Sequence, residues 1–172
     1  MDNCSTIKLQ RILKIRTTNT QSMESTEEQN KHVVRQFFEA LNRQDTERIG
    51  QLVSSTNYSF HFPGMPPMDW KGDKQFIAAI NNAFPDLRNN IVDIVAEEDK
   101  VAVRFNVTAT HKGEFQSIPP SGKEVSFSGM AFLTVTDAKV SEEWATADMM
   151  GLMQQIGAIP TTSSATGSTT RS

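Results

Sequence analysis

The sequence predicts one α+β domain in which three helices precede a sheet of sequential antiparallel strands. Two observations support this fold class. Before Pro85, apolar residues recur every three or four positions, as they do on the buried face of a helix; after it they alternate with polar residues, as they do on a strand. The chain of 172 residues is long enough for one such domain with a tail at each end.

Three helices are expected before that proline. The first follows Ser25, and its early acidic residues suit the positive end of the helix dipole. A short second helix begins after a cap at Asp45 or Thr46 and ends near Val53. The third is expected over about residues 74–83, where a proline then stops it. The apolar stripe of the first helix, which should face the core, consists of Val33, Val34, Phe37, Phe38 and Leu41.

Strands are expected at one short segment and four longer ones. The short strand is YSFHF, and a Pro/Gly-rich loop follows it. The longer strands are predicted at residues 88–97, 101–111, 123–136 and 139–147. Their short connections predict an antiparallel meander. Because Met130 and Phe132 lie opposite the core-facing residues of their strand, we expect both faces of that strand to be covered.

The two ends of the chain differ in composition from the predicted domain at residues 25–159. Residues 1–24 are basic and rich in Ser and Thr, which is typical of a transit segment, of a disordered basic tail, or of sequence upstream of a true start at Met23. Residues 160–172 are of low complexity and are expected to be disordered. We expect a cytoplasmic protein, or an organellar one if residues 1–22 are a transit segment.

Composition argues against several classes of function. A net charge of −3 gives no reason to expect a nucleic-acid partner, and no apolar run approaches the roughly 20 residues that would span a membrane. Cys4 is the only cysteine, so no disulfide framework is expected. His32, His61 and His111 are scattered, and no glycine-rich phosphate loop is present. We therefore expect neither a metal site nor a nucleotide-binding site.

Asp148 is the strongest candidate for acid/base chemistry. It follows the last predicted strand, and if strict alternation from Val140 persists, Asp148 and Trp144 point to the same side of the sheet. One interpretation makes Asp148 the N-cap of the helix MMGLMQQIG. The other places a desolvated carboxyl group in a pocket, where its pKa would rise towards neutrality. One residue could also do both.

Three further residues have two interpretations each. His61 lies between two phenylalanines at the end of a short strand, and is either a half-buried histidine bonded to backbone or a pocket residue. Arg104 alternates with apolar neighbours on a central strand, and is either a paired surface charge or a pocket donor. Trp70 either closes the mouth of a pocket or anchors its loop.

Four segments, in this order and spacing, are similar to one known family: FPDL (84–87), VAVRFNVTATHKGEF (101–115), IPPSGKEVSFSGMAF (118–132) and EEWATADMMGLMQQIG (142–157). The sequence resembles the SnoaL-like polyketide cyclases, or ester cyclases, of the nuclear-transport-factor-2-like superfamily, over about residues 30–157. The resemblance implies a cone, in which a strongly curved antiparallel sheet wraps around a pocket that helices close. It also implies chemistry without a metal or an organic cofactor.

The resemblance further implies a reaction and its residues. Family cyclases close a polyketide ester by an intramolecular aldol reaction, in which an aspartate exchanges protons with the substrate. The pattern W…D..GL.QQ.G aligns that aspartate with Asp148, and a cleft histidine matches His61. The sequence departs from the family pattern at three positions. It has Ala138 where many relatives have glycine, Glu143 where many have histidine, and Thr134 near a position where a basic residue or histidine is common. Loss of such a partner removes a donor that could stabilise an enolate.

We therefore expect a cofactor-independent enzyme that performs an aldol cyclisation or an isomerisation on a hydrophobic carbonyl compound. The expected catalytic residues are Asp148 and His61. The alternative is a non-catalytic module of the same fold that binds a small molecule or dimerises. A homodimer is expected because dimerisation through the outer face of the sheet is common in the superfamily. The residues expected to contact the substrate are Arg104, Trp70, Trp144, Phe38, Phe132 and Met130.

Overall fold

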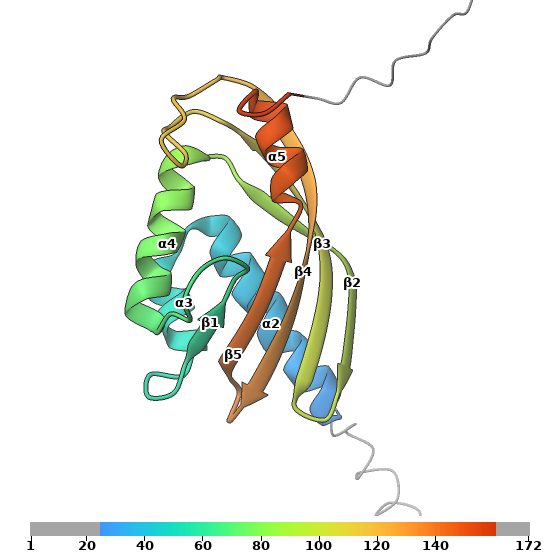
Figure 1. Cartoon of the computed structure of the whole chain (residues 1–172). Coiled ribbons are helices and arrows are strands. Elements are labelled where there is room, and N and C mark those ends of the chain that lie inside the picture. The colour runs from blue at the N-terminus through green and yellow to red at the C-terminus, as the bar shows by residue number, and fades with distance from the viewer. Residues whose placement is uncertain (1–24, 161–172) are drawn as a thin grey trace, which may run out of the picture.

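The computed structural model describes residues 25–160, and the expectations for the two ends of the chain lie outside these residues. Four helices precede, interrupt and follow five strands within this range (Figure 1). The helices are α2 (Thr26–Arg43), α3 (Thr46–Leu52), α4 (Trp70–Ala83) and α5 (Met149–Ile156). The strands are β1 (Ser59–His61), β2 (Arg88–Glu97), β3 (Lys100–Thr110), β4 (Glu124–Thr136) and β5 (Lys139–Ala147).

The five strands form one sheet in the order β1-β5-β4-β3-β2. Strands β2 to β5 make the expected antiparallel meander, and β1 pairs in parallel with β5 at one edge. Figure 1 shows the sheet strongly curved, with α2, α3 and α4 on its concave side and α5 across one end. The α+β fold class and the order of the elements are thus as predicted. No helix in the described range is long and apolar enough to cross a membrane.

Helix α4 begins four residues earlier than the sequence analysis placed it. Asp69 is its N-cap, and the carboxylate of Asp69 accepts a hydrogen bond of 2.8 Å from the Gly72 backbone N–H. This extension adds a first turn that contains Asp73. Asp73 lies one turn before the apolar residues Phe76 and Ile77, on the face of the helix that turns towards the sheet.

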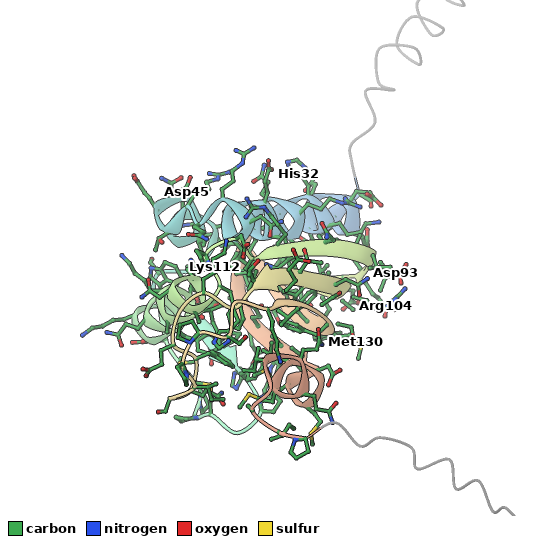
Figure 2. The ribbon with its side chains drawn as sticks, turned by 90° about the horizontal axis from the view of Figure 1, so that it is seen from above. His32, Asp45, Asp93, Arg104, Lys112 and Met130 are labelled. Carbon is green, nitrogen blue, oxygen red and sulfur yellow. The ribbon has the colours of Figure 1, made fainter. Side chains whose placement is uncertain are left out.

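The concave face of the sheet holds the core. Alternate residues of β3 and β4 are buried there, including Val101, Val103, Ala131 and Leu133, and the α2 stripe packs against them. The prediction that both faces of β4 are covered is wrong for the described chain. Met130 and Phe132 are 58% and 48% exposed on the convex face, and Figure 2 shows Met130 pointing outward there, near Arg104.

A one-residue β-bulge in β5 moves the side chains that follow it to the opposite face of the sheet from the one that strict alternation predicts. Thr134 pairs with Glu142 and the next residue, Val135, pairs with Val140, so Ser141 is an extra residue in β5. Val140 and Ser141 are consequently both buried, and strict alternation resumes one position later. Because side chains alternate with a period of two, one extra residue moves every later side chain of the strand to the other face.

The bulge has opposite effects on Glu143 and Trp144. Glu143 points into the concave side and is only 7% exposed, whereas Trp144 is 53% exposed on the convex side. Glu142, Trp144 and Thr146 share a face, as predicted, but it is the outer face of the sheet. The prediction that Val140 shares this face is wrong, because the bulge separates them.

Candidate active site

An apolar cavity of about 450 Å³ lies between the concave face of the sheet and helices α2, α4 and α5. Its volume is in the range of small-molecule sites. Nine of the ten phenylalanines of the chain line it; the tenth, Phe132, lies on the convex face. The nine are Phe37, Phe38, Phe60, Phe62, Phe76, Phe84, Phe105, Phe115 and Phe127.

Two carboxyl groups line this apolar cavity, those of Asp73 and Glu143. Asp73 is 2% exposed and Glu143 is 7% exposed. Both contact the hydroxyl group of one buried tyrosine: Tyr58 Oη lies 2.8 Å from Asp73 Oδ2 and 3.2 Å from Glu143 Oε2. Within the described chain, no other side chain or backbone group donates a hydrogen bond to either carboxyl group.

Three elements bring these groups together. Parallel pairing of β1 with β5 sets Phe60 beside Glu143, and Tyr58, two residues before Phe60, points to the same side. The early start of α4 supplies Asp73 from above the sheet. The cluster therefore depends on the bulge in β5, the register of β1 and the cap of α4.

Burial raises the pKa values of both carboxyl groups. Desolvation raises the pKa of Glu143 to about 8, with a further increase from the nearby Asp73 carboxylate, and the contact with Tyr58 offsets part of this. Desolvation raises the pKa of Asp73 to about 6, against a lowering by the Tyr58 hydroxyl. Burial, followed by the charges of Glu143 and Asp73, raises the pKa of Tyr58, which stays protonated.

These values define the protonation of the cluster near neutral pH. Asp73 is ionised and accepts the Tyr58 proton across the shorter contact. Glu143 is mostly protonated, and its O–H can donate to Tyr58 Oη or to a molecule in the cavity. Two carboxyl groups whose pKa values differ in this way provide an acid and a base in one site.

Asp148 lies outside the cavity, contrary to the expectation. It is exposed at the start of α5, where its Oδ1 atom accepts a hydrogen bond of 2.8 Å from Gly151 N–H. The residue is therefore the N-cap of α5, which was one of its two interpretations. The pocket interpretation fails because the Asp148 carboxylate caps α5 at an exposed position and does not line the cavity.

His61 and Trp144 also point away from the cavity. They are neighbours across β1 and β5, and their rings stack 3.8 Å apart at 3° on the convex side. The His61 Nε2 atom lies 2.8 Å from Ser59 Oγ and 3.6 Å from a carboxylate oxygen of Glu142. His61 is half-buried, but its ring nitrogen contacts a side chain and not the backbone, and the structure does not bring it to the cavity.

The expected substrate contacts divide between the two sides of the sheet. Arg104 is exposed on the convex face, where its Nε atom donates a 2.8 Å hydrogen bond to Asp93 (Figure 2). Met130, Phe132 and Trp144 share that face, so the expectation that they line the pocket is corrected. Trp70 starts α4 and packs edge-on against Tyr58 at 6.2 Å, without lining the cavity. Among the expected contacts, Phe38 lines it.

Sequence reasoning missed Tyr58, Asp73 and Glu143. Asp73 carried a signal, because it precedes Phe76 and Ile77 by three and four residues and so occupies the apolar face of α4. Glu143 was noticed as a departure from the family pattern and not as a site residue. Within the described range, no group of three or more His, Cys, Asp or Glu side chains is arranged to hold a metal ion.

Comparison with known proteins identifies the family. The family model of SnoaL-like polyketide cyclases matches residues 31–156, which is most of the folded domain. The chain therefore belongs to the SnoaL-like polyketide cyclase family, whose fold is that of the nuclear-transport-factor-2-like proteins. No curated protein matches the sequence.

Solved structures agree with this family. A proposed hydroxylase, AclR from Streptomyces galilaeus, is 31% identical with a TM-score of 0.72, over 78% of this chain and 85% of that one. A proposed SnoaL-like polyketide cyclase from Jannaschia sp. CCS1 is 24% identical with a TM-score of 0.73, over 81% and 99%. A proposed polyketide cyclase from Streptomyces antibioticus, IdmH, is 26% identical with a TM-score of 0.68, over 74% and 98%.

The raised pKa of Glu143 predicts a pH-dependent stability. Above about pH 4.5 the unfolded chain has lost this proton, while the folded chain keeps it until about pH 8. The contribution of Glu143 to the free energy of unfolding therefore decreases as pH rises from about 4.5 to about 8. We expect the melting temperature of Glu143→Gln to fall less than that of the wild type between pH 5 and 8.5, as measured by calorimetry.

Glu124→Gln is the control, because Glu124 is exposed at the start of β4. This variant should follow the wild-type profile. Identical pH profiles for wild type and Glu143→Gln would show that the Glu143 carboxyl group is not desolvated.

Proposed function

We propose that this protein performs cofactor-independent acid/base chemistry on a hydrophobic carbonyl compound bound in the cavity. The observation that carries the proposal is the pair of buried carboxyl groups, Asp73 and Glu143, that face a mainly apolar cavity and share the Tyr58 hydroxyl group. Membership of a polyketide cyclase family supports this type of reaction. The proposal transfers the acid/base role from Asp148 to this pair.

Each step of the proposed reaction balances in protons. The Asp73 carboxylate removes a proton from the carbon next to the substrate carbonyl, while the Glu143 carboxylic acid gives its proton to the carbonyl oxygen, which yields an enol. In an aldol cyclisation, the enol carbon then forms a bond to the carbon of a second carbonyl in the same molecule. The enol O–H returns its proton to the Glu143 carboxylate, and the oxygen of the second carbonyl takes the proton held by Asp73. In an isomerisation, Asp73 gives its proton to another carbon of the enol system, and the enol O–H again returns its proton to Glu143.

The cavity favours this chemistry in two ways. Its walls are mainly phenylalanine and both carboxyl groups are buried, so a carboxylate inside it is less solvated and a stronger base than in solution. Tyr58 joins the two carboxyl groups, and its hydroxyl group can pass a proton between them. A positioned acid and base of this kind each contribute about 10²–10⁴-fold to a rate.

Hydrogen exchange at carbon tests the proposal without knowledge of the natural substrate. Hydrophobic ketones such as 2-tetralone exchange the protons next to their carbonyl with D₂O, and NMR follows the loss of the signal. We expect the wild type to accelerate exchange, and Asp73→Asn and Glu143→Gln each to reduce the enzymatic rate by about 100-fold or more, because each lacks one proton-transfer group.

Asp148→Asn is the matched control, because it changes an acid outside the cavity and keeps an N-cap residue. It should exchange at the wild-type rate. Loss of exchange in Asp148→Asn with normal exchange in Asp73→Asn would return the acid/base role to Asp148. Absence of exchange by the wild type over a panel of ketones would favour the alternative, a module that binds its ligand without catalysis.

We also propose that the convex face of the sheet pairs with that of a second copy. Five large apolar side chains are exposed there, and in the described chain no helix covers them (Figure 2). Such a contiguous exposed patch is typical of an interaction surface. The five residues are Val92, Val95, Met130, Phe132 and Trp144.

Light scattering after gel filtration tests the dimer. The wild type should have twice the chain mass of 19.1 kDa, and Phe132→Lys should have the monomer mass, because a lysine would be buried without a partner. Ala78→Lys, at an exposed position of α4, should leave the dimer intact. A monomeric wild type at about 0.1 mM, an ordinary concentration for a stable homodimer, would refute the proposal.

A further inference from the structure

We propose that the cavity selects hydrophobic molecules that carry a basic nitrogen, and holds the ammonium group between Asp73 and Glu143 against the phenylalanine rings. The inference concerns the same cavity and carboxyl pair as the proposed function, on which it rests for the site. An ammonium group held there occupies both the acid and the base, so such a molecule is a ligand that competes with the carbonyl substrate. It follows from the charges, the hydrogen bonds and the aromatic rings that line the cavity.

The charges of the lining residues are of one sign. The polar side chains are those of Asp73 and Glu143 and three amides, Asn81, Asn89 and Gln116. The lining contains no lysine, arginine or histidine. A carboxylate or phosphate ligand would therefore enter a low-dielectric space with no positive partner, next to two acidic groups, which is strongly unfavourable.

The carboxyl pair itself lacks a positive partner. The ion pairs found in the described part of the chain include neither Asp73 nor Glu143. Each carboxyl group contacts Tyr58 through one oxygen atom, Oδ2 of Asp73 and Oε2 of Glu143. The second oxygen of each group accepts no hydrogen bond within the described residues, although both side chains are more than nine-tenths buried.

A buried acidic group without a cationic partner is costly to keep ionised. With the pKa of Asp73 near 6 and that of Glu143 near 8, the pair carries about one negative charge at neutral pH. A ligand with one positive charge neutralises the pair, and its N–H groups can donate to the two free carboxyl oxygens. A neutral apolar ligand leaves the charge in place, and an anionic ligand doubles it.

Aromatic rings lie where the ammonium group would sit. Phe76 is one helical turn after Asp73 on α4, and Phe60 is paired with Glu143 across β1 and β5. The rings of Phe60 and Phe76 are 5.6 Å apart, and Phe62 is 6.0 Å from Phe76. A cation over the face of such a ring is stabilised by about 0.5–2 kcal/mol, more when water is excluded. The remaining rings can pack against the apolar body of the ligand.

Three probes of the same shape and different charge test this inference. They are 2-naphthylmethylamine as the cation, 2-naphthylmethanol as the neutral molecule and 2-naphthoate as the anion, each titrated into the full-length protein by calorimetry at pH 7. We expect the amine to bind at least about tenfold more tightly than the alcohol, and the anion at least about tenfold more weakly than the alcohol.

Variants test whether the carboxyl pair causes the preference for the amine over the alcohol. Asp73→Asn with Glu143→Gln should abolish the preference for the amine and keep the affinity for the alcohol, which shows that the cavity is intact. Asp148→Asn should behave as the wild type, because its carboxyl group lies outside the cavity.

Three outcomes overturn the inference. The first is equal affinity for the amine and the anion, and the second is a preference for the amine that survives in the double variant. The third is no binding of any probe up to about 1 mM, a concentration that corresponds to only about 4 kcal/mol of binding free energy. These outcomes are distinct from failure of the proposed function. Ketone exchange without amine binding rejects the charge selectivity alone, and amine binding without exchange rejects the catalysis alone.

Discussion

The bulge at Ser141 determines which side chains of β5 face the cavity. Without the extra residue, strict alternation would carry the inward orientation of Val140 to Glu142 and Trp144, and Glu143 would face solvent. With it, a carboxyl group enters an apolar cavity and a tryptophan leaves it. The candidate site therefore depends on a local irregularity of one strand, and the regular part of the sheet supplies its walls.

The Tyr58 hydroxyl group lowers the energetic cost of burying two carboxyl groups side by side. Two acids at such short distances from one oxygen atom cannot both ionise without a large electrostatic cost, and the separation of their pKa values reflects this. One proton shared within the cluster leaves a single negative charge, which the tyrosine hydroxyl group partly satisfies. The same arrangement that lowers this cost provides an acid and a base together and favours a cation as the occupant.

Much of the fold could be predicted from sequence because it depends on local periodicity and on caps. The helices at Ser25 and Asp45, the four long strands and the alternation of faces along β3 and β4 all follow from such signals. The start of α4 was missed because the capping role of Asp69, which follows a proline-rich loop, was not recognised, and this removed Asp73 from consideration.

The site was harder to predict, for a physical reason. Alternation groups residues by face but does not say which face is inward, and an aromatic residue such as Trp144 marks the core in most sheets. Here the outer face is apolar as well, and the inner positions of β5 from the bulge onward are small or acidic: Ser141, Glu143, Ala145 and Ala147. We could decide between the two interpretations of Asp148 only once it was known which side chains of β5 point inward.

The most direct test of this account is a ¹³C NMR titration of the aspartate and glutamate carboxyl carbons, assigned with Asp73→Asn and Glu143→Gln. The account predicts that the Glu143 signal titrates near pH 8 and the Asp73 signal near pH 6, as one coupled pair. A Glu143 carboxyl group that titrates near 4.5, its value in water, would place it in solvent and contradict the inward orientation on which the proposed chemistry rests.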